Sequence, residues 1–515
     1  MQVLHYNNAF SEILLLNQRY VIRSNFKMPA SQQVKNQHLL WRAGFGVNAE
    51  TVSNIAVVSH TALYKVLETA SLSQAAYIDV ANDTVKGLLM GFQQVADMQQ
   101  MQASVNQNQR REFRKASAQN IKNLNTTWLN EMATGDAQLR EKLALFWHGH
   151  FACRNLNIFY QQLLLQQIRS NALTNFGDLL KGVSKSAGML NFLNNQQNQK
   201  QHPNENFARE VMELFTMGRG NYTEQDVKEA ARAFTGWEAK FNGDFIFRAF
   251  FHDDEEKTFL GKKGNFDGDD ILNIILEQPQ TATFITKKIY KYFVNQNVDE
   301  DIIAALSTSF YESNYDIKML MKNIFTSEWF YNEKNIGCKI KSPVELLVGI
   351  RRMLPMQLED ERTQLLLENA LGQILFYPPN VAGWPGGNAW IDSSTLMLRL
   401  RIPQLIKNDD TFYITEKTDD DVQMGMEDNE KSYTKQLSKG GFRIAANINW
   451  SAYTQQFEHV NHEDLYNSIE AVVLQTNKGS INKNIIEAGI KSNNKEEYIK
   501  NVTIALMSTP EYQLC

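Results

Sequence analysis

The apolar residues of this chain recur mostly at helical spacing. In segment 138–147, Leu139, Leu143 and Phe146 stand at positions i, i+4 and i+7, which share one face of a helix. A second helix is predicted over 204–217, where the apolar stripe consists of Phe207, Val211, Leu214 and Phe215. The pattern indicates amphipathic helices packed around a core.

Capping residues mark the start of further helices. Thr223 followed by Asp226 resembles a capping box, in which two backbone N–H groups are satisfied reciprocally. Ser342, Pro343 and Glu345 supply a cap, a first-turn proline and an N3 carboxylate. Both segments are therefore predicted to open helices.

One region departs from helical spacing. Asn242-Gly243 is a turn signal, and the alternating apolar residues that follow it run from Phe245 to Phe251. This predicts a small β-hairpin near 239–261. The fold class is accordingly mainly α, a large irregular helical body with one hairpin.

Composition and charge narrow the function classes. The 515 residues are 43% hydrophobic, which suffices for a large core. The 52 basic and 57 acidic residues give a net charge of −5, and this balance argues against a nucleic-acid partner. No segment approaches the roughly 20 apolar residues of a membrane span. Three widely spaced cysteines argue against a disulfide framework or a thiolate zinc site.

The chain is predicted to comprise an N-terminal extension over 1–35 and one domain over 36–515. Polar, low-complexity composition predicts solvated or flexible loops near 98–110, 194–201 and 408–440. The short apolar run near the N-terminus has no cleavage pattern and is a poor signal peptide, which favours the cytoplasm.

Several segments together resemble the bacterial family catalogued as domain of unknown function 1800. They are HLLWRAGFG (38–46), LREKLALFWHGHF (139–151), NENFAREVMELFTMG (204–218), YTEQDVKEAARAFTGW (222–237), FHDDEEKTFLG (251–261) and PPNVAGWPGGNAWI (378–391). The resemblance covers residues 36–515. It implies a cell-envelope or secreted protein, often encoded beside a sulfatase-like protein, which is the expected partner. It supplies no reaction and no catalytic residue.

His148 and His150 are the first candidate site residues. They do not share a helix face, but they can converge if the helix ends near Gly149. Imidazoles at such a bend are candidate ligands of a divalent metal. The competing interpretation is a helix C-terminal cap and a core histidine.

Charged residues of the helix over 204–217 are the second candidate. Glu205, Arg209 and Glu213 follow one stripe, and Glu210 lies three residues before Glu213. Paired carboxylates can exchange protons, so Glu210, Glu213 and Arg209 are the predicted catalytic residues. A solvated, salt-bridged face explains the same spacing.

His252 and Asp253 follow the predicted hairpin strand, and a charged turn is the competing interpretation. With His148, His150, Glu210 and Glu213 they provide the ligand types of a mixed nitrogen and oxygen site. We therefore predict a divalent metal as cofactor, held by a subset of these six residues, with His148, His150, His252 and Asp253 as the favoured ligands.

The segment 378–391 combines prolines and glycines with Trp384 and Trp390. Aromatic loops bind sugars and aromatic ligands, so both tryptophans are candidate ligand contacts. The alternative is a structural turn that packs both rings between helices.

Two functions remain open from the sequence. One is a metal-dependent enzyme, a hydrolase or an enzyme of oxygen chemistry, which needs the candidate segments to meet in one pocket. The other is a non-catalytic binding or scaffold protein that partners the sulfatase-like protein and needs only a recognition surface.

Overall fold

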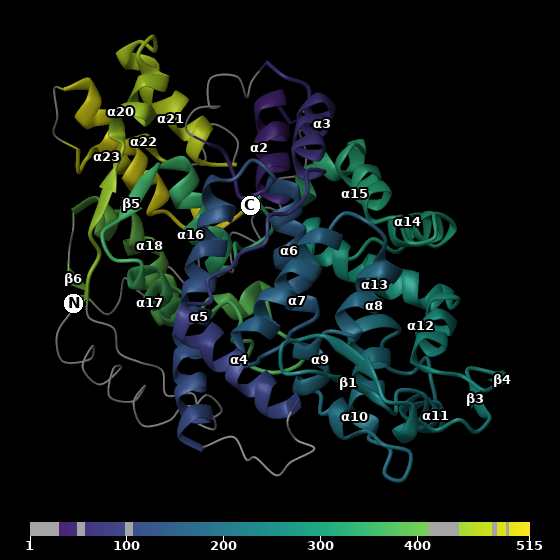
Figure 1. Ribbon diagram of the computed structural model, residues 1–515. Helices are drawn as coiled ribbons and strands as arrows, with labels where there is room; N and C mark the ends of the chain where they lie inside the picture. The colour runs from purple at the N-terminus through teal and green to yellow at the C-terminus, as the bar shows by residue number, and fades with distance from the viewer. Residues whose placement is uncertain are drawn as a thin grey trace.

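The protein is built mainly from helices (Figure 1), as the sequence predicted. Its strands form only two-stranded antiparallel sheets in the part of the chain that the structure describes. This computed structural model describes residues 30–48, 57–97, 107–408, 411–412, 442–475, 481–490 and 494–515. Within these ranges no helix is both long and apolar enough to cross a membrane.

Among the first helices, the long helix α5 contacts α4, α6 and α7, α3 packs on α2 and α6, and α8 and α9 pack on α7. The first helices are α2 (Gln32–Arg42), α3 (His60–Ser71), α4 (Asp83–Asp97), α5 (Gln107–Thr134), α6 (Gln138–His150), α7 (Ile158–Asn171), α8 (Phe176–Ser184) and α9 (Ala187–Phe192).

The middle of the chain forms the opposite side of the molecule from the last helices (Figure 1). Its helices are α10 (Glu205–Glu210), the π-helix η3 (Val211–Thr216), α11 (Glu224–Ala233), α12 (Gly268–Leu276), α13 (Pro279–Phe293), α14 (Glu300–Glu312) and α15 (Ile317–Phe325). The last helices are α16 (Pro343–Met353), α17 (Arg362–Leu371), α18 (Ser393–Asn408), α20 (Trp450–Thr454), α21 (Leu465–Val473), α22 (Lys483–Glu487) and α23 (Lys495–Met507).

Four strand pairs complete the fold, in the order β1–β2, β3–β4, β5–β8 and β6–β7. The strands are β1 (Trp237–Ala239), β2 (Phe245–Phe247), β3 (Lys257–Phe259), β4 (Lys262–Gly264), β5 (Met356–Leu358), β6 (Thr411–Phe412), β7 (Phe442–Arg443) and β8 (Ala446–Ile448).

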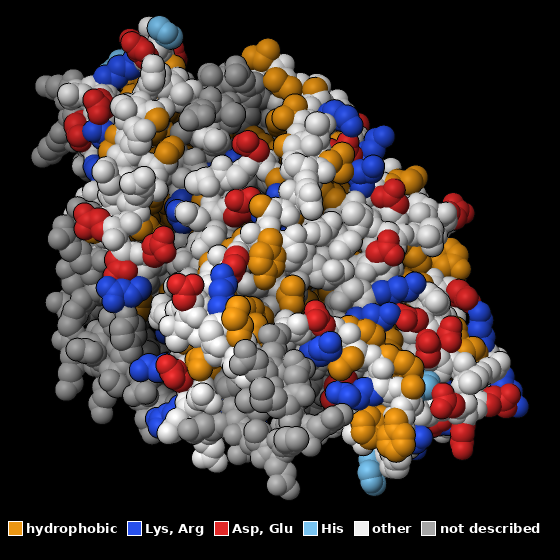
Figure 2. Space-filling model, in the orientation of Figure 1, with side chains coloured by type: hydrophobic (Ala, Val, Ile, Leu, Met, Phe, Trp, Pro, Cys, Tyr) orange, Lys and Arg blue, Asp and Glu red, His pale blue; other side chains and the backbone are white. Residues whose placement is uncertain are grey.

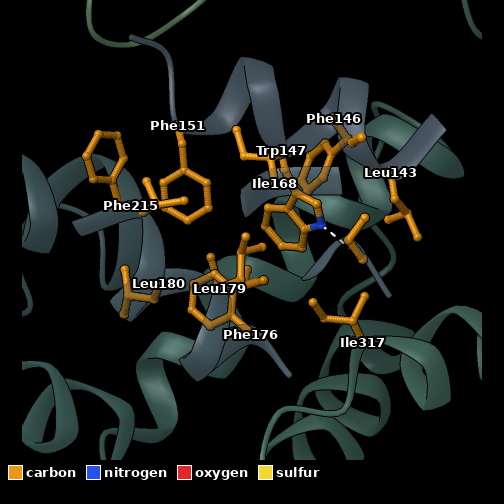
Figure 3. Close-up of a cluster of buried hydrophobic side chains, with 14 of the residues drawn as sticks. Leu143, Phe146, Trp147, Phe151, Ile168, Phe176, Leu179, Leu180, Phe215 and Ile317 are labelled. Carbon is orange, nitrogen blue, oxygen red and sulfur yellow. Dashed lines mark hydrogen bonds between the residues drawn. The ribbon is translucent and has the colours of Figure 1, made fainter. Parts of the chain in front are cut away.

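Buried apolar side chains form two clusters that meet at α16. Val344 and Val348 of this helix belong to the larger cluster, whereas Leu346 and Ile350 belong to the smaller one. Figure 3 shows part of the larger cluster around Trp147, whose indole N–H donates to the carbonyl of Ala172 over 3.2 Å. Helix α16 thus connects the body formed by α2–α15 to the last helices.

The predicted hairpin is present, with its turn at Asn242-Gly243. Gly243 has a φ of 102°, a conformation that favours glycine, and Lys240 and Asp244 close the turn. The strand is shorter than the alternation suggested, because β2 ends at Phe247. A 3-10 turn, η4 (Ala249–Phe251), follows it, and β3 and β4 form a second hairpin.

Three predicted helix starts agree with the structure. The side chain of Asn204 accepts from the backbone N–H of Asn206 at the start of α10. Thr223 with Asp226, and Ser342 with Glu345, form complete capping boxes at α11 and α16.

Segment 194–201 differs from the solvated loop that its composition predicted. Asn195 and Asn198 are buried and donate to the carbonyls of Phe234, Trp237 and Ala231. Their amides satisfy the chain that links α11 to the hairpin. The other two predicted loops fall largely outside the described residues.

Candidate functional site

Helix α6 carries both candidate histidines and continues through His150. It therefore ends near Gly149, as predicted, but the two rings do not bind a common group. Both imidazoles are buried, and they contact different segments of the chain.

The ring of His148 is held between aromatic groups and a backbone amide. Its Nε2 accepts from the N–H of Phe376 over 3.1 Å, and the rings of Trp128 and Trp384 lie 5.3 and 5.6 Å away. Burial lowers the pKa of His148 to about 3. The imidazole is therefore neutral, and one of its two nitrogens is already engaged.

The ring of His150 forms a hydrogen bond with the π-helix η3. Its Nε2 donates to the carbonyl of Phe215 over 3.0 Å, and its Nδ1 accepts from Lys288, 3.3 Å away. The same ammonium donates to the carbonyl of Leu214 over 2.9 Å. Since π-helices end with unpaired carbonyls like other helices, His150 and Lys288 together satisfy two of them. Figure 3 shows the rings of Phe151 and Phe215 side by side, and their centroids are 5.3 Å apart.

The predicted stripe of Glu205, Arg209 and Glu213 forms only in part, because Arg209 pairs with Glu205 but not with Glu213. Arg209 binds Glu205 and Glu224, with nitrogen–oxygen distances from 2.7 to 3.0 Å. The helix changes from α to π at Val211, and its wider turn moves Glu213 out of the α-helical register.

Glu213 and Glu210 lie in different environments. Glu213 accepts from Arg219 and from the hydroxyl of Tyr222. Glu210 makes no hydrogen bond or ion pair with any described residue, and burial and the neighbouring Glu213 raise its pKa. The pair thus contains one fixed and one unpaired carboxyl group.

His252 and Asp253 follow η4 and bind neighbouring groups. Nδ1 of His252 donates to the carbonyl of Thr235 over 2.9 Å. The Asp253 carboxylate accepts two hydrogen bonds from Arg232, of 2.7 and 3.1 Å. Burial raises the pKa of Asp253, but the hydrogen bonds from Arg232 outweigh it and lower that pKa overall.

The structure does not assemble the predicted ligand types around one point. Among the described residues, no group of three or more His, Cys, Asp and Glu side chains could hold a metal ion. His148, His150, His252 and Asp253 each bind a neighbouring backbone or side-chain group instead.

The loop with Trp384 and Trp390 covers the end of α6. Trp390 is buried and Trp384 is half-buried against His148. Gly383, with a φ of 80°, lies so close to α6 that a Cβ atom there would be 2.4 Å from the Gly149 carbonyl oxygen. Phe376, at the start of this loop, has a φ of 68°, which is rare for a bulky residue.

A polar groove lies elsewhere, where α5 meets α6 and α16 meets the β5–β8 pair. Its volume is about 870 Å³. The lining residues come from four separate segments and are mostly amides, hydroxyls and charged groups: Asn48, Ala133, Thr134, Asp136, Arg351, Arg352, Pro355, Met356, Gln357, Asn447, Ile448, Asn449, Trp450 and Ser451.

Arg351 and Arg352 bind neutral groups in this groove. Arg351 donates to the side-chain oxygens of Gln364 and Asn130. Arg352 donates to the carbonyl of Ala133 over 2.9 Å. Neither guanidinium forms an ion pair with a described residue, and the Nε of each is buried without a hydrogen-bond partner.

The electrostatics of the groove follow from this burial. Burial lowers the pKa of Arg352 to about 10, an effect that the nearby Asp136 opposes. Burial likewise lowers the pKa of Arg351. Both side chains stay charged at neutral pH, so the groove contains two cations and one anion.

Sequence reasoning missed this groove. The adjacent arginines directly after the buried apolar run of α16 were its most visible signal, since paired charges beside a core are costly without a purpose. The remaining lining residues have no local pattern, because long-range packing brings them together.

The histidine-containing end of α6 and the polar groove both lie inside a segment that matches a known family. The family model described as "Protein of unknown function (DUF1800)" matches residues 38–514. This chain belongs to the DUF1800 family. Comparison with curated proteins and with solved structures gives no match.

The DUF1800 match confirms the resemblance seen in the sequence. The matched residues include all groove-lining positions, from Asn48 to Ser451, and the contact between α6 and the tryptophan loop. In this DUF1800 protein, the sequence motifs that indicated the family lie mostly on helices α2, α6, α10 and α11 and the π-helix η3, whereas the groove is lined by other segments.

Proposed function

We propose that this protein is a non-catalytic binding protein that recognises its ligand in the groove between α5, α16 and the β5–β8 pair. One observation carries the proposal: Arg351 and Arg352 line a groove of about 870 Å³, and neither forms an ion pair with a described residue, although Glu361 and Asp136 lie near enough to act on them electrostatically. Concave sites with a few convergent polar groups are the usual form of ligand sites.

Most of the predicted catalytic and metal-binding residues are occupied by hydrogen bonds and ion pairs within the fold, which supports a binding function over a catalytic one. His148 and His150 accept or donate hydrogen bonds that hold the tryptophan loop and the π-helix in place. Arg209 and Asp253 form ion pairs. These side chains stabilise the fold, and the groove leaves polar groups available for recognition.

The test is a binding screen with a matched pair of tryptophan variants. We expect a panel of oligosaccharides and peptides, measured by titration calorimetry, to contain a ligand that Trp450→Ala binds at least about tenfold more weakly. Trp329→Ala removes another half-buried tryptophan outside the groove and should leave binding unchanged. A ligand that Trp450→Ala binds as well as the wild type would place recognition elsewhere.

A second candidate function rests on Glu210 and Glu213. Burial and the neighbouring Glu213 raise the pKa of Glu210, as is typical of a general acid, and π-helical turns often occur at functional sites. We propose hydrolysis as the reaction class in that case, with Arg209 as a positioning residue. Loss of a measured hydrolytic activity in Glu210→Gln, with Glu205→Gln unaffected, would favour this function over binding alone.

We also propose a sulfatase-like protein as partner and a divalent metal as ligand of the histidine residues. The partnership with a sulfatase-like protein would be supported by stoichiometric co-purification of the two proteins. A divalent metal at His148, His150, His252 or Asp253 would be supported by stoichiometric metal that is lost in His252→Ala, and elemental analysis measures this.

A further inference from the structure

We infer that the ligand of the groove is an acidic oligosaccharide, a sugar chain that carries carboxylate or sulfate groups. This inference rests on the proposed binding function and adds the chemical class of the ligand. It follows from the charges in the groove, from the geometry of their donors, and from the neutral groups beside them.

The charges favour an anion. Asp136, Arg351 and Arg352 are the ionisable residues that line the groove, so its lining carries a net positive charge although the whole chain is acidic. Glu361, outside the lining, also acts on Arg351. Figure 2 shows positive and negative side chains intermingled over the described part of the visible face. A cation that is removed from water without a paired anion is costly, and a bound anion would offset that cost.

The Nη groups of the two guanidiniums are the donors that can reach a bound oxyanion. Arg351 and Arg352 follow each other at the end of α16, and the Nε–H of each is buried and out of reach of a ligand. Nη2 of Arg352 makes no hydrogen bond to a described residue and is not among the buried atoms. A guanidinium binds carboxylate, sulfate or phosphate through two parallel hydrogen bonds. The carbonyl and amide oxygens that Arg351 and Arg352 contact hold the two forks in position without neutralising them.

The neutral lining favours a sugar chain as the carrier of the anion. Gln357 and Asn447 stand directly opposite each other in the β5–β8 pair, and both are exposed. Facing side chains of an antiparallel pair lie on one side of the sheet, so these two amides present donors and acceptors together. Asn449 and Ser451 continue the polar row into α20. Vicinal hydroxyl groups of a sugar are natural partners for such amides.

Trp450 supplies the apolar component. Its ring is half-buried, lines the groove and lies beside the same row of amides. The flat face of an aromatic ring packs against the apolar face of a sugar ring, while the polar edge of the sugar reaches hydrogen-bond partners. In one groove, the amides can therefore bind the hydroxyl groups of an acidic sugar, the tryptophan its apolar face and the arginines its acidic group.

An acidic peptide is the main competing ligand. Peptides bound in extended form usually pair through their backbone with an open strand edge and place alternate side chains in pockets. The two-stranded β5–β8 pair has open edges, but the groove is lined mainly by polar side chains, and these suit hydroxyl groups better than a peptide backbone.

The experiment titrates the full chain with four defined probes. They are an oligogalacturonate, a sulfated dextran fragment, a neutral maltohexaose and a poly-glutamate peptide of similar length. We expect the two acidic sugars to bind, and the affinity to fall about tenfold or more in Arg352→Gln. Arg219→Gln, which removes an exposed arginine distant in sequence from the groove, should bind as the wild type does.

A salt titration of the wild type tests for binding through charge without relying on a variant, which could misfold. Binding through charge should weaken by roughly tenfold between low and high ionic strength, because salt screens exposed charges. Thermal unfolding of Arg352→Gln shows whether that variant is folded at the assay temperature.

The outcomes separate this inference from the proposed function. Equal binding of maltohexaose and the acidic sugars, without salt dependence, would overturn the acidic class but keep the groove as a binding site. Binding of poly-glutamate alone would overturn the sugar class. Absence of binding for every probe and for the wider panel would overturn both.

Discussion

The backbone N–H of Phe376 donates a hydrogen bond to Nε2 of His148, although the two residues are 228 positions apart. The preceding N–H, that of Leu375, donates to the buried carboxyl group of Glu368 over 3.1 Å. Phe376 has a left-handed backbone, which costs on the order of 1–3 kcal/mol. His148 and Glu368 therefore hold a strained point at the start of the tryptophan loop.

Replacement of His148 should destabilise the fold. His148→Ala leaves the buried N–H of Phe376 without an acceptor and opens a cavity below Trp384, so we expect a loss of about 2–4 kcal/mol in the free energy of unfolding. Denaturant titration measures this loss. His148→Gln offers another acceptor and should lose less.

The same variant also tests the role of the imidazole. If His148 only accepts a hydrogen bond, added Zn²⁺ should change the stability of wild type and His148→Ala equally. Selective stabilisation of the wild type by Zn²⁺ would contradict the structural role and support the metal site.

Acid should destabilise the protein through its buried histidines. The pKa of His148 is about 3 in the folded state against an ordinary 6.5, so the unfolded chain takes up the proton first as the pH falls. This contribution is fully present above pH 6.5 and is lost as the pH falls from 6.5 toward 3, by up to about 1.4 kcal/mol per pH unit. His150 acts in the same direction.

Unfolding measured between pH 4 and pH 7 checks this effect, with His148→Gln as the comparison. The variant lacks one of the titrating groups, so its stability should depend less steeply on pH. An identical pH profile for wild type and variant would show that His148 is not buried as a neutral ring.

Glu368 should titrate in the opposite direction. Burial raises its pKa from 4.5 to about 7, so the folded state keeps a proton that the unfolded chain releases. Its contribution to stability is present below pH 4.5 and is lost as the pH rises through about 7. Glu368→Gln stays neutral and should be more stable than the wild type at pH 8, by about 2 kcal/mol.

Thermal unfolding at pH 5 and pH 8 separates this effect from a general change in packing. We expect the advantage of Glu368→Gln to appear only at the higher pH, because the wild-type carboxyl group is protonated at the lower one. A variant that is destabilised equally at both values would mean that Glu368 is ionised in the folded protein.

Much of the local structure could be predicted from the sequence, because its causes are local. Capping residues such as Asn204 and Thr223 lie within one turn of the groups that they satisfy, and Asn242-Gly243 determines its own turn. The buried amides of Asn195 and Asn198 could not be predicted, because their carbonyl partners lie more than 30 residues away.

The candidate site was harder to predict for the same reason. The sequence indicated His148 and His150 as candidate metal ligands, but their hydrogen bonds depend on Phe376 and Phe215, which are distant in the chain. The π-helical turn that displaces Glu213 has no recognised sequence signal. The groove needs four segments to pack correctly before it exists.

Glu345 should be among the most sensitive positions of the protein. Its buried carboxylate binds Lys142 and Lys339, and these lysines together outweigh burial and hold its pKa well below the usual range. Glu345→Gln leaves two buried lysines without their anion, so we expect a loss of about 3–5 kcal/mol. Denaturant titration measures it.

Glu277→Gln is the matched control, because its ion pair with Lys262 is exposed. That change should stay within about 0.5 kcal/mol of the wild type. Equal effects of the two substitutions would mean that the carboxylate of Glu345 contributes no more than a surface charge.

The most direct measurement is a crystal structure of the full chain with a bound acidic oligosaccharide. We predict that the acidic group of the sugar contacts the guanidinium of Arg352 or Arg351 and that a sugar ring packs on Trp450. A sugar bound outside the groove, or an empty groove at a saturating concentration of a sugar that binds in solution, would contradict the proposed recognition site.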